Sequence, residues 1–433
     1  MTQKPTLIAG ARIVDPASGR DARGDILFTD EILDLADAIE APNAARIDGA
    51  GLCVMPGLID MRVGIGEPGA EHRETFKSAG RAAAAGGVTT LVMTPGADPV
   101  IDVPSLVDFV LRRAPARAPV HILPAAALTK GLKGELMTEF GLLQEAGAVM
   151  FSNGDRPVVD SRVLRRALAY STVFGALVAH RPEDPFLAAG GVMHEGELAA
   201  RLGLPGVPAA AETIMAVRDL TLAELTGARL MLDMLSSAAT LEYLDRAKKR
   251  GVNAVASVSV HHLTLNEQDV DGYRTFAKLS PPLRNEADRA ALCDAVSRGL
   301  IDVIVSGHDP WPAENKRLPF DEAASGAAAL ETLLPAALQL HHNGAARLID
   351  VVRAMTLRPA ELLGLKQGRL AKGAPADLIL VDLDAPYRLD SDLLLSKSKN
   401  SPFDEKLMQG RVLRTFVSGA CIFRNETYTD QSG

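Results

Sequence analysis

The sequence has few cysteines and no long apolar run. Its 433 residues include three cysteines, Cys53, Cys293 and Cys421, which lie far apart and form no CxxC pair. This distribution argues against both a disulfide-stapled secreted domain and a cysteine zinc site. No run of about 18 uncharged apolar residues occurs, so no membrane-spanning helix is predicted. The segment 1–10 also lacks the apolar core of a signal peptide. We therefore expect a cytoplasmic protein with no membrane partner.

An excess of positive charge is missing as well. Lys and Arg number 46 against 54 Asp and Glu, which gives a formal net charge of −8. Proteins that hold a nucleic-acid backbone carry a basic field or patch, so nucleic acid is not an expected partner. Hydrophobic residues make up 47% of the chain and charged residues 23%. This composition is typical of a globular protein with a buried core and excludes a disordered, collagenous or coiled-coil chain.

The middle of the chain alternates short apolar runs with helical stretches. Eight runs have the character of buried strands: 58–65, 89–95, 120–128, 148–153, 173–180, 228–235, 253–260 and 302–308. Near-continuous apolar strands indicate a parallel sheet that helices cover on its outer face. Seven helical stretches lie between them: 73–85, 103–112, 132–145, 161–169, 209–222, 238–249 and 286–298. This alternation predicts an α/β fold, a (β/α)8 barrel of the TIM type.

Both ends of the chain are β-rich instead. Strand-like runs bounded by Gly, Pro or Asp lie at 6–15, 25–37, 376–384 and 410–424. A closed barrel brings its first strand close to its last helix, so we expect the two ends to join in one small β-sandwich. The predicted domains are a sandwich made of 1–54 with 361–433, and a barrel over 55–360.

Chemistry in such a barrel takes place at the carboxyl ends of the strands. Candidate side chains there are His180 after the fifth strand, His261 and His262 after the seventh, and His308 and Asp309 after the eighth. A hydrolytic zinc site needs at least three nitrogen or oxygen ligands, but no HxH or HExxH pair points to one. Adjacent residues of a strand face opposite ways, so the two neighbouring histidines are not expected to share an ion.

Two arginines are candidates for ligand binding. Arg62 and Arg284 could bind an anionic ligand through bidentate hydrogen bonds, which the planar guanidinium favours. They could equally form salt bridges within loops. The residues alone leave both interpretations open.

Seven segments carry a resemblance to a known family. They are MPGLIDMRVGIGEPGAE (55–71), AAAAGGVTTLVMTPGADPVID (82–102), FSNGDRPVVD (151–160), HHLTL (261–265), KLSPPLR (278–284), GLIDVIVSGHDP (299–310) and SKSKNSPF (396–403). Together they resemble dihydroorotase of the amidohydrolase superfamily over essentially the whole chain. The resemblance implies a barrel with a β-sandwich made from both termini. It also implies zinc-dependent cyclisation of carbamoyl aspartate to dihydroorotate, a step of pyrimidine (UMP) biosynthesis.

Most of the family's zinc positions are nevertheless substituted here. His180 matches a family ligand and is retained. The positions that match other family ligands are Arg62 and Gly64 at an HxH pair, Asn153 at a bridging aspartate, Met234 at a histidine, and Gly307 at the aspartate that binds metal and moves the proton. Gly66 and Gly96 stand where the family has a substrate-binding arginine and asparagine.

The resemblance and its departures imply a catalytically inactive homologue with no cofactor, a pseudoenzyme. It would act as the structural partner of aspartate carbamoyltransferase in a hetero-oligomer, as non-catalytic members of the family do. The alternative is an active dihydroorotase or related cyclic-amide hydrolase that holds zinc in a rebuilt site of His180, His261, His308 and Asp309. A third hypothesis is a small-molecule sensor that binds an anion at Arg62 and Arg284.

Overall fold

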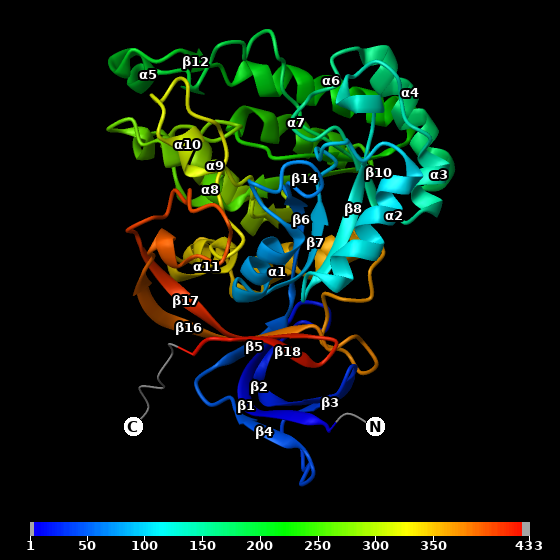
Figure 1. Cartoon of the computed structure of the whole chain (residues 1–433), viewed down its shortest axis with the longest axis vertical. Coiled ribbons are helices and arrows are strands. Elements are labelled where there is room, and N and C mark those ends of the chain that lie inside the picture. The colour runs from blue at the N-terminus through cyan, green and yellow to red at the C-terminus, as the bar shows by residue number, and fades with distance from the viewer. Residues whose placement is uncertain (1–3, 427–433) are drawn as a thin grey trace.

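The computed structural model describes residues 4–426, and its central feature is a barrel of eight parallel strands (Figure 1). The strands are β6 (Leu58–Val63), β7 (Val88–Met93), β8 (His121–Ala127), β9 (Met150–Ser152), β10 (Leu177–His180), β13 (Arg229–Leu232), β14 (Ala254–Ser259) and β15 (Val303–Val305). Their order in the sheet follows the chain, and a backbone bridge between Val63 and His308 joins the last strand to the first. The predicted fold class is therefore confirmed.

The barrel strands are buried on both faces, as their apolar composition requires. Every residue of β6, β7 and β14 is buried. Side chains that point inward, such as Met61, Val92 and Met231, form one apolar core inside the barrel. Side chains that point outward, such as Leu91 and Leu230, pack in the core beneath the surrounding helices.

The principal helices are α1 (Phe76–Ala85), α2 (Pro104–Arg113), α3 (Phe140–Glu145), α4 (Ser161–Ser171), α6 (Ala210–Thr226), α7 (Ala238–Lys249), α9 (Glu286–Ser297), α11 (Leu333–His342), α12 (Leu348–Met355) and α13 (Leu357–Leu363). All seven predicted helical stretches overlap one of them, and α2, α4 and α6 extend beyond the predicted ends. An excursion between β10 and β13 adds the small pair β11 (Met193–His194) and β12 (Gly206–Val207) with α5 (Glu197–Leu202). No helix within residues 4–426 has the length and apolarity needed to cross a membrane.

Three local predictions were wrong. The helix expected from residue 132 begins only at Phe140, because Gly131 and Leu132 adopt φ values of 60° and 59° and break the chain direction. The strand expected from residue 173 begins at Leu177, after a short 3₁₀ turn that ends at Gly175 with φ 60°. His261 and His262 lie in the one-turn helix α8 (Val260–Thr264), not at the end of a strand.

The two ends of the chain meet in one mixed sheet, which lies below the barrel in Figure 1. Its strands are β1 (Thr6–Asp15), β2 (Arg20–Phe28), β3 (Ile32–Ala36), β4 (Ala45–Asp48), β5 (Cys53–Pro56), β16 (Leu378–Arg388), β17 (Leu407–Val417) and β18 (Ala420–Arg424). Strand β5 is the junction, because it pairs parallel with β1 and antiparallel with β16. The domain boundaries at 54 and 361 stay predictions.

An aromatic contact joins the two ends within this sheet and gives a first prediction. The rings of Phe28 and Phe416 meet edge to face with centroids 5.2 Å apart, and both side chains are buried. Changing either to Ala should lower the free energy of unfolding by about 3–5 kcal/mol. The double variant should lose less than the sum, because such ring pairs couple by about 0.5–1.5 kcal/mol. Urea denaturation measures all three.

Phe186→Ala is the control, because Phe186 is 78% exposed and its loss should change stability by less than about 0.5 kcal/mol. Strictly additive losses from Phe28 and Phe416 would contradict a direct contact between the chain ends.

Candidate functional site

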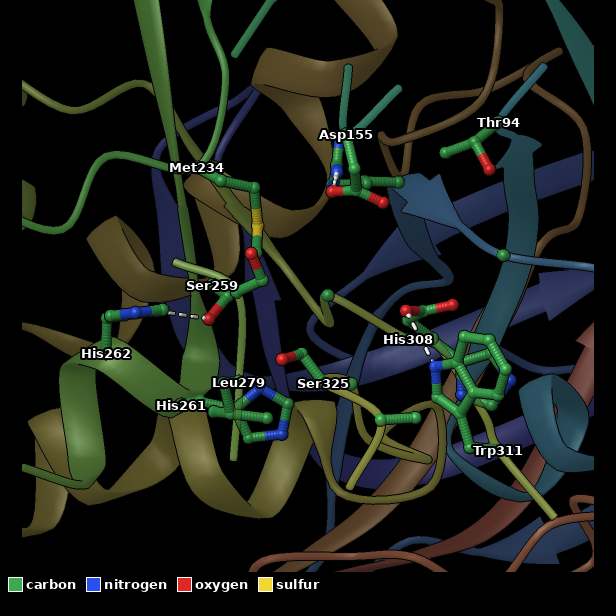
Figure 2. Close-up of a pocket in the computed structure, with 17 residues that line it drawn as sticks. Thr94, Asp155, Met234, Ser259, His261, His262, Leu279, His308, Trp311 and Ser325 are labelled. Carbon is green, nitrogen blue, oxygen red and sulfur yellow. Dashed lines mark hydrogen bonds and ion pairs between the residues drawn. The ribbon is translucent and has the colours of Figure 1, made fainter. Parts of the chain in front are cut away.

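A cavity of about 410 Å³ lies at the carboxyl ends of the barrel strands (Figure 2). It brings together most of the residues that the sequence singled out: Arg62, Gly64, Met234, His261, His262, Gly307, His308 and Asp309. An adjoining hollow of about 250 Å³ is lined by Gly66 and Gly96. Three sequence candidates, His180, Asn153 and Arg284, do not line either space.

Arg62 extends from β6 into a group of carboxylates. Its Nη1 donates to Oδ2 of Asp233, and its Nη2 donates to Oδ1 of Asp155 at 2.5 Å. The same Asp155 oxygen accepts from Nη1 of Arg181 at 2.9 Å. Burial opposes the charge on Arg62, but the two carboxylates outweigh it and raise the pKa of the guanidinium. A fixed positive charge therefore stands at the mouth of the barrel.

His180, at the end of β10, has both ring nitrogens bonded within the protein. Its Nε2 accepts the backbone N–H of Val158 at 2.8 Å, so the proton sits on Nδ1, which donates to Oδ2 of Asp219 at 2.6 Å. The side chain is 0% exposed. The lone pair that a metal ion would need thus points at a backbone amide.

The two adjacent histidines of α8 do different things. His262 accepts from Oγ of Ser259 at 2.8 Å, and its Nε2 donates to the carbonyl of Pro281 at 3.1 Å. His261 stacks on Phe403 with centroids 5.6 Å apart and lines the cavity. Burial lowers the pKa of His261 to about 3 and that of His262 to about 4. Both rings are therefore neutral at physiological pH.

His308 and Asp309 follow β15 and are held by neighbours outside the barrel interior. Nδ1 of His308 accepts the backbone N–H of Ala329 at 3.0 Å, and its Nε2 lies 3.4 Å from Oε2 of the buried Glu74. Asp309 accepts from Arg73 and, at 3.3 Å, from Nε1 of Trp311. Burial raises the pKa of Asp309 above its usual range, and the Asp155 carboxylate adds to this shift.

The glycines of the mouth leave little room for larger side chains. A Cβ on Gly66 would lie 2.0 Å from the carbonyl oxygen of Ala70, so an arginine does not fit there in this backbone. Gly307 has φ 65°, and its Cβ would lie 3.1 Å from Cβ of Ser259 and 3.3 Å from Cε of Met234. Gly96, in contrast, has open space around it.

Asn153 and Arg284 serve the surrounding loops. The Asn153 amide accepts from Oγ1 of Thr129 at 2.8 Å and donates to the carbonyl of Arg156 at 2.8 Å. Arg284 donates to the carbonyl of Val207 at 2.7 Å and to Oγ of Ser236 at 3.1 Å. Arg284 and Arg62 are therefore not brought to one cavity.

Sequence reasoning gave no role to four residues that shape the mouth: Asp155, Arg181, Arg73 and Trp311. Two of them carried a positional signal, because Asp155 follows β9 closely and Arg181 comes directly after His180. Trp311 is the only tryptophan of the chain, and the guanidinium of Arg73 lies 3.7 Å from the centroid of its ring. That contact had no sequence signal.

Comparison with known proteins decides the family. A dihydro-orotase-like model matches residues 51–239, and an amidohydrolase family model matches residues 188–422. A dihydroorotase of Wolbachia sp. subsp. Drosophila simulans is 39% identical, and the match covers 96% of this chain and 95% of that protein. One of Syntrophus aciditrophicus is 37% identical over 97% and 99%. The chain belongs to the dihydroorotase family.

Solved structures agree with the fold. The L-hydantoinase (dihydropyrimidinase) of Arthrobacter aurescens superposes with a TM-score of 0.87 at 25% identity, and the match covers 97% of this chain and 96% of that one. The dihydropyrimidinase of Brevibacillus agri superposes with a TM-score of 0.83 at 20% identity over 97% and 95%. These relatives confirm the amidohydrolase-type barrel.

The residues of this family member do not fit a hydrolytic zinc site. Within residues 4–426 no three His, Cys, Asp or Glu side chains are grouped so that they could hold a metal ion. His180 uses its lone pair on Val158, and Gly64, Met234 and Gly307 offer no nitrogen or oxygen side-chain ligand. That the protein needs no cofactor stays a prediction.

The Arg62 ion pairs give a second prediction. Arg62→Met leaves the buried Asp233 carboxylate without its guanidinium, and such an unpaired buried charge costs about 3–5 kcal/mol of folding free energy. Chemical denaturation measures the loss.

Arg298→Met is the matched control, because it breaks a pair with Asp294 whose side chains are 58% and 60% exposed. Pairs of that kind contribute less than about 1 kcal/mol. Equal losses in the two variants would mean that Arg62 is not the centre of the mouth.

Proposed function

We propose that this member of the dihydroorotase family serves pyrimidine biosynthesis in the cytoplasm as a non-catalytic homologue. One observation carries the proposal: a guanidinium, paired with Asp233 and Asp155, fills the position of the family's first histidine ligand. A guanidinium has only N–H donors and no lone pair to offer a metal ion, so this position supplies no ligand. The bonded lone pair of His180 supports the same conclusion.

A general base is also hard to find among the cavity residues. An efficient base has a pKa near the working pH. The pKa of His261 is about 3, because the ring is buried. Burial raises the pKa of Asp309, but its carboxylate is held in an ion pair with Arg73. Gly307 stands where the family has its proton-transferring aspartate. The active alternative needs His180 and His261 on one ion, yet only His261 lines the cavity.

The proposal extends to a structural role as partner of aspartate carbamoyltransferase. It rests on the segments that the chain keeps. The segment 396–403 still ties the terminal sheet to the barrel, because Lys397 N donates to Glu74 Oε1 at 3.2 Å and Asn400 Nδ2 donates to the Gly326 carbonyl at 2.9 Å. A well-packed scaffold whose cavity lacks the family's metal ligands is suited to binding another protein through its surface.

A third prediction tests catalysis. The purified protein should not convert carbamoyl aspartate to dihydroorotate, with or without added zinc, as followed by absorbance or chromatography. Gly307→Asp should not restore the reaction, because ligands are still missing at Arg62, Gly64 and Met234, and catalytic groups that act as a unit are strongly non-additive.

Metal analysis after dialysis against zinc is the companion measurement. One equivalent that remains bound and is lost in His180→Ala, together with ring closure by the unmodified protein, would replace this proposal with the rebuilt-site alternative.

A fourth prediction tests the partner. Co-expressed aspartate carbamoyltransferase should co-elute with this protein in size-exclusion chromatography. A complex stable enough to survive the column normally buries more than about 1,000 Å². By mass action, the melting temperature of the transferase should rise with added protein. Separate elution at micromolar concentration, with unchanged stability of the transferase, would rule out the structural role.

A further inference from the structure

Carboxylates outnumber guanidinium groups around the barrel-mouth cavity, and each of these guanidinium groups is already ion-paired. Four carboxylates form its lining and the layer behind it: Asp155, Asp309, Asp233 and Glu183. The three guanidiniums beside them, Arg62, Arg73 and Arg181, are each ion-paired with one or two of these carboxylates. The arginines therefore neutralise neighbouring acids and do not present an unpaired positive charge to a ligand.

Lys316 lies near Asp309, behind the cavity wall, but it does not direct its N–H groups into the cavity. Its Nζ donates to the backbone carbonyls of Thr275, Lys278 and Ala324 at 3.0, 3.3 and 2.7 Å. Burial lowers its pKa to about 7, while the three accepting carbonyls stabilise its ammonium form. Its three donors are aimed at carbonyls and not into the cavity.

Asp155 offers one oxygen to the open space. Both of its guanidinium partners, Arg62 and Arg181, bond to Oδ1. No residue within 4–426 donates to Oδ2, and the side chain is 57% exposed. Figure 2 shows the Asp155 carboxylate on the opposite side of the cavity from His261. Asp309 lines the same cavity and lies close enough for the two acids to repel each other.

His261 is the second feature that calls for a ligand. The residue is 1% exposed, and its Nε2 has no hydrogen-bond partner among residues 4–426. Its Nδ1 lies on the cavity side, 3.7 Å from where a Cβ on Gly307 would be. A buried polar side chain without a partner costs free energy. A neutral imidazole of this kind can accept a hydrogen bond from an N–H group.

We propose that this cavity binds a small organic cation, whose amidinium or ammonium group lies between Asp155 and Asp309 while its apolar part packs on Met234 and Leu279. The cation would relieve the repulsion between the two carboxylates, and a separate N–H group of a longer ligand would donate to Nδ1 of His261 across the cavity. Met234 and Leu279 line the cavity and supply an apolar wall. This inference goes beyond the structural role proposed above and does not depend on a protein partner. The proposed ligand is a cation, whereas the sequence hypothesis for Arg62 and Arg284 was an anion.

Three molecules of nearly the same shape test the charge directly. Benzamidine is cationic, benzamide is neutral and benzoate is anionic, and isothermal titration calorimetry with the full-length protein compares them. Benzamidine should bind saturably with a dissociation constant on the order of 1 mM or tighter, which is ordinary for a ligand of this size. Benzamide should bind at least tenfold more weakly, and benzoate should not bind.

Two variants locate the site. Asp309→Asn should weaken benzamidine at least tenfold, because it removes one of the two charges. Ser325→Leu, which fills part of the cavity, should weaken it without changing any charge. The control is Asp294→Asn, an exposed acid on α9, which should leave binding unchanged. Thermal unfolding of each variant verifies that it is folded.

Several outcomes would overturn the inference. They are benzoate binding as tightly as benzamidine, no saturable benzamidine binding at about ten times the expected 1 mM constant, and unchanged binding in both folded cavity variants. Displacement of benzamidine by equimolar zinc would show a metal site instead, and would contradict the proposed function as well. Failure of carbamoyltransferase association, in contrast, would leave the benzamidine result intact.

Discussion

The pairing of Arg62 with Asp233 and Asp155 is the constraint on which the rest of the site depends. A buried guanidinium is tolerated only when carboxylates compensate its lost hydration. Asp233 follows β13 and Asp155 follows β9, so one side chain from β6 links three strand ends across the barrel mouth. Arg181 then completes the charge balance at Asp155 and continues the network to Glu183. Because both arginines bond to Oδ1 of Asp155, its Oδ2 is left to the cavity. The preference of the cavity for a cation follows from this arrangement.

The substitutions around Arg62 are mutually dependent. His180 keeps its position, but Asp219 and Val158 hold both ring nitrogens. Cε of Met234 and a Cβ on Gly307 would approach to 3.3 Å, so the thioether fills the space toward which an aspartate at 307 would extend. A histidine at 62 would remove the guanidinium from Asp233 and leave it the hydroxyl of Ser257 as a side-chain partner. Each position is thus stabilised by its present neighbours, and the return of one ligand would strain the others.

The fold could be predicted from the sequence much further than the site could. The α7 boundaries 238–249 follow from hydrophobic periodicity, and the eight strands follow from short, nearly continuous apolar runs; both are local properties of the sequence. The late start of α3 goes with a positive φ at Leu132. A leucine in that backbone conformation has no signature in the sequence, even next to a glycine. Arg284 and Asn153 were assigned to a site by their positions, but their side chains turn to loop carbonyls that periodicity cannot locate. The charge of the ligand that the cavity favours could not be predicted either, because the sequence does not show which acidic and basic side chains are already ion-paired.

The segments PPLR and SKSKNSPF need not be explained by catalysis. The carbonyls of Pro281 and Pro282 accept from Nε2 of His262, which fixes the turn beside His261. Oδ1 of Asn400 accepts the backbone N–H of Trp311 at 3.2 Å, and its Nδ2 holds the Gly326 carbonyl. Both contacts shape the cavity wall next to Asp309. A chain that binds a ligand at the mouth without transforming it would have the same need for these segments as an enzyme, because the demand is on geometry and not on proton transfer.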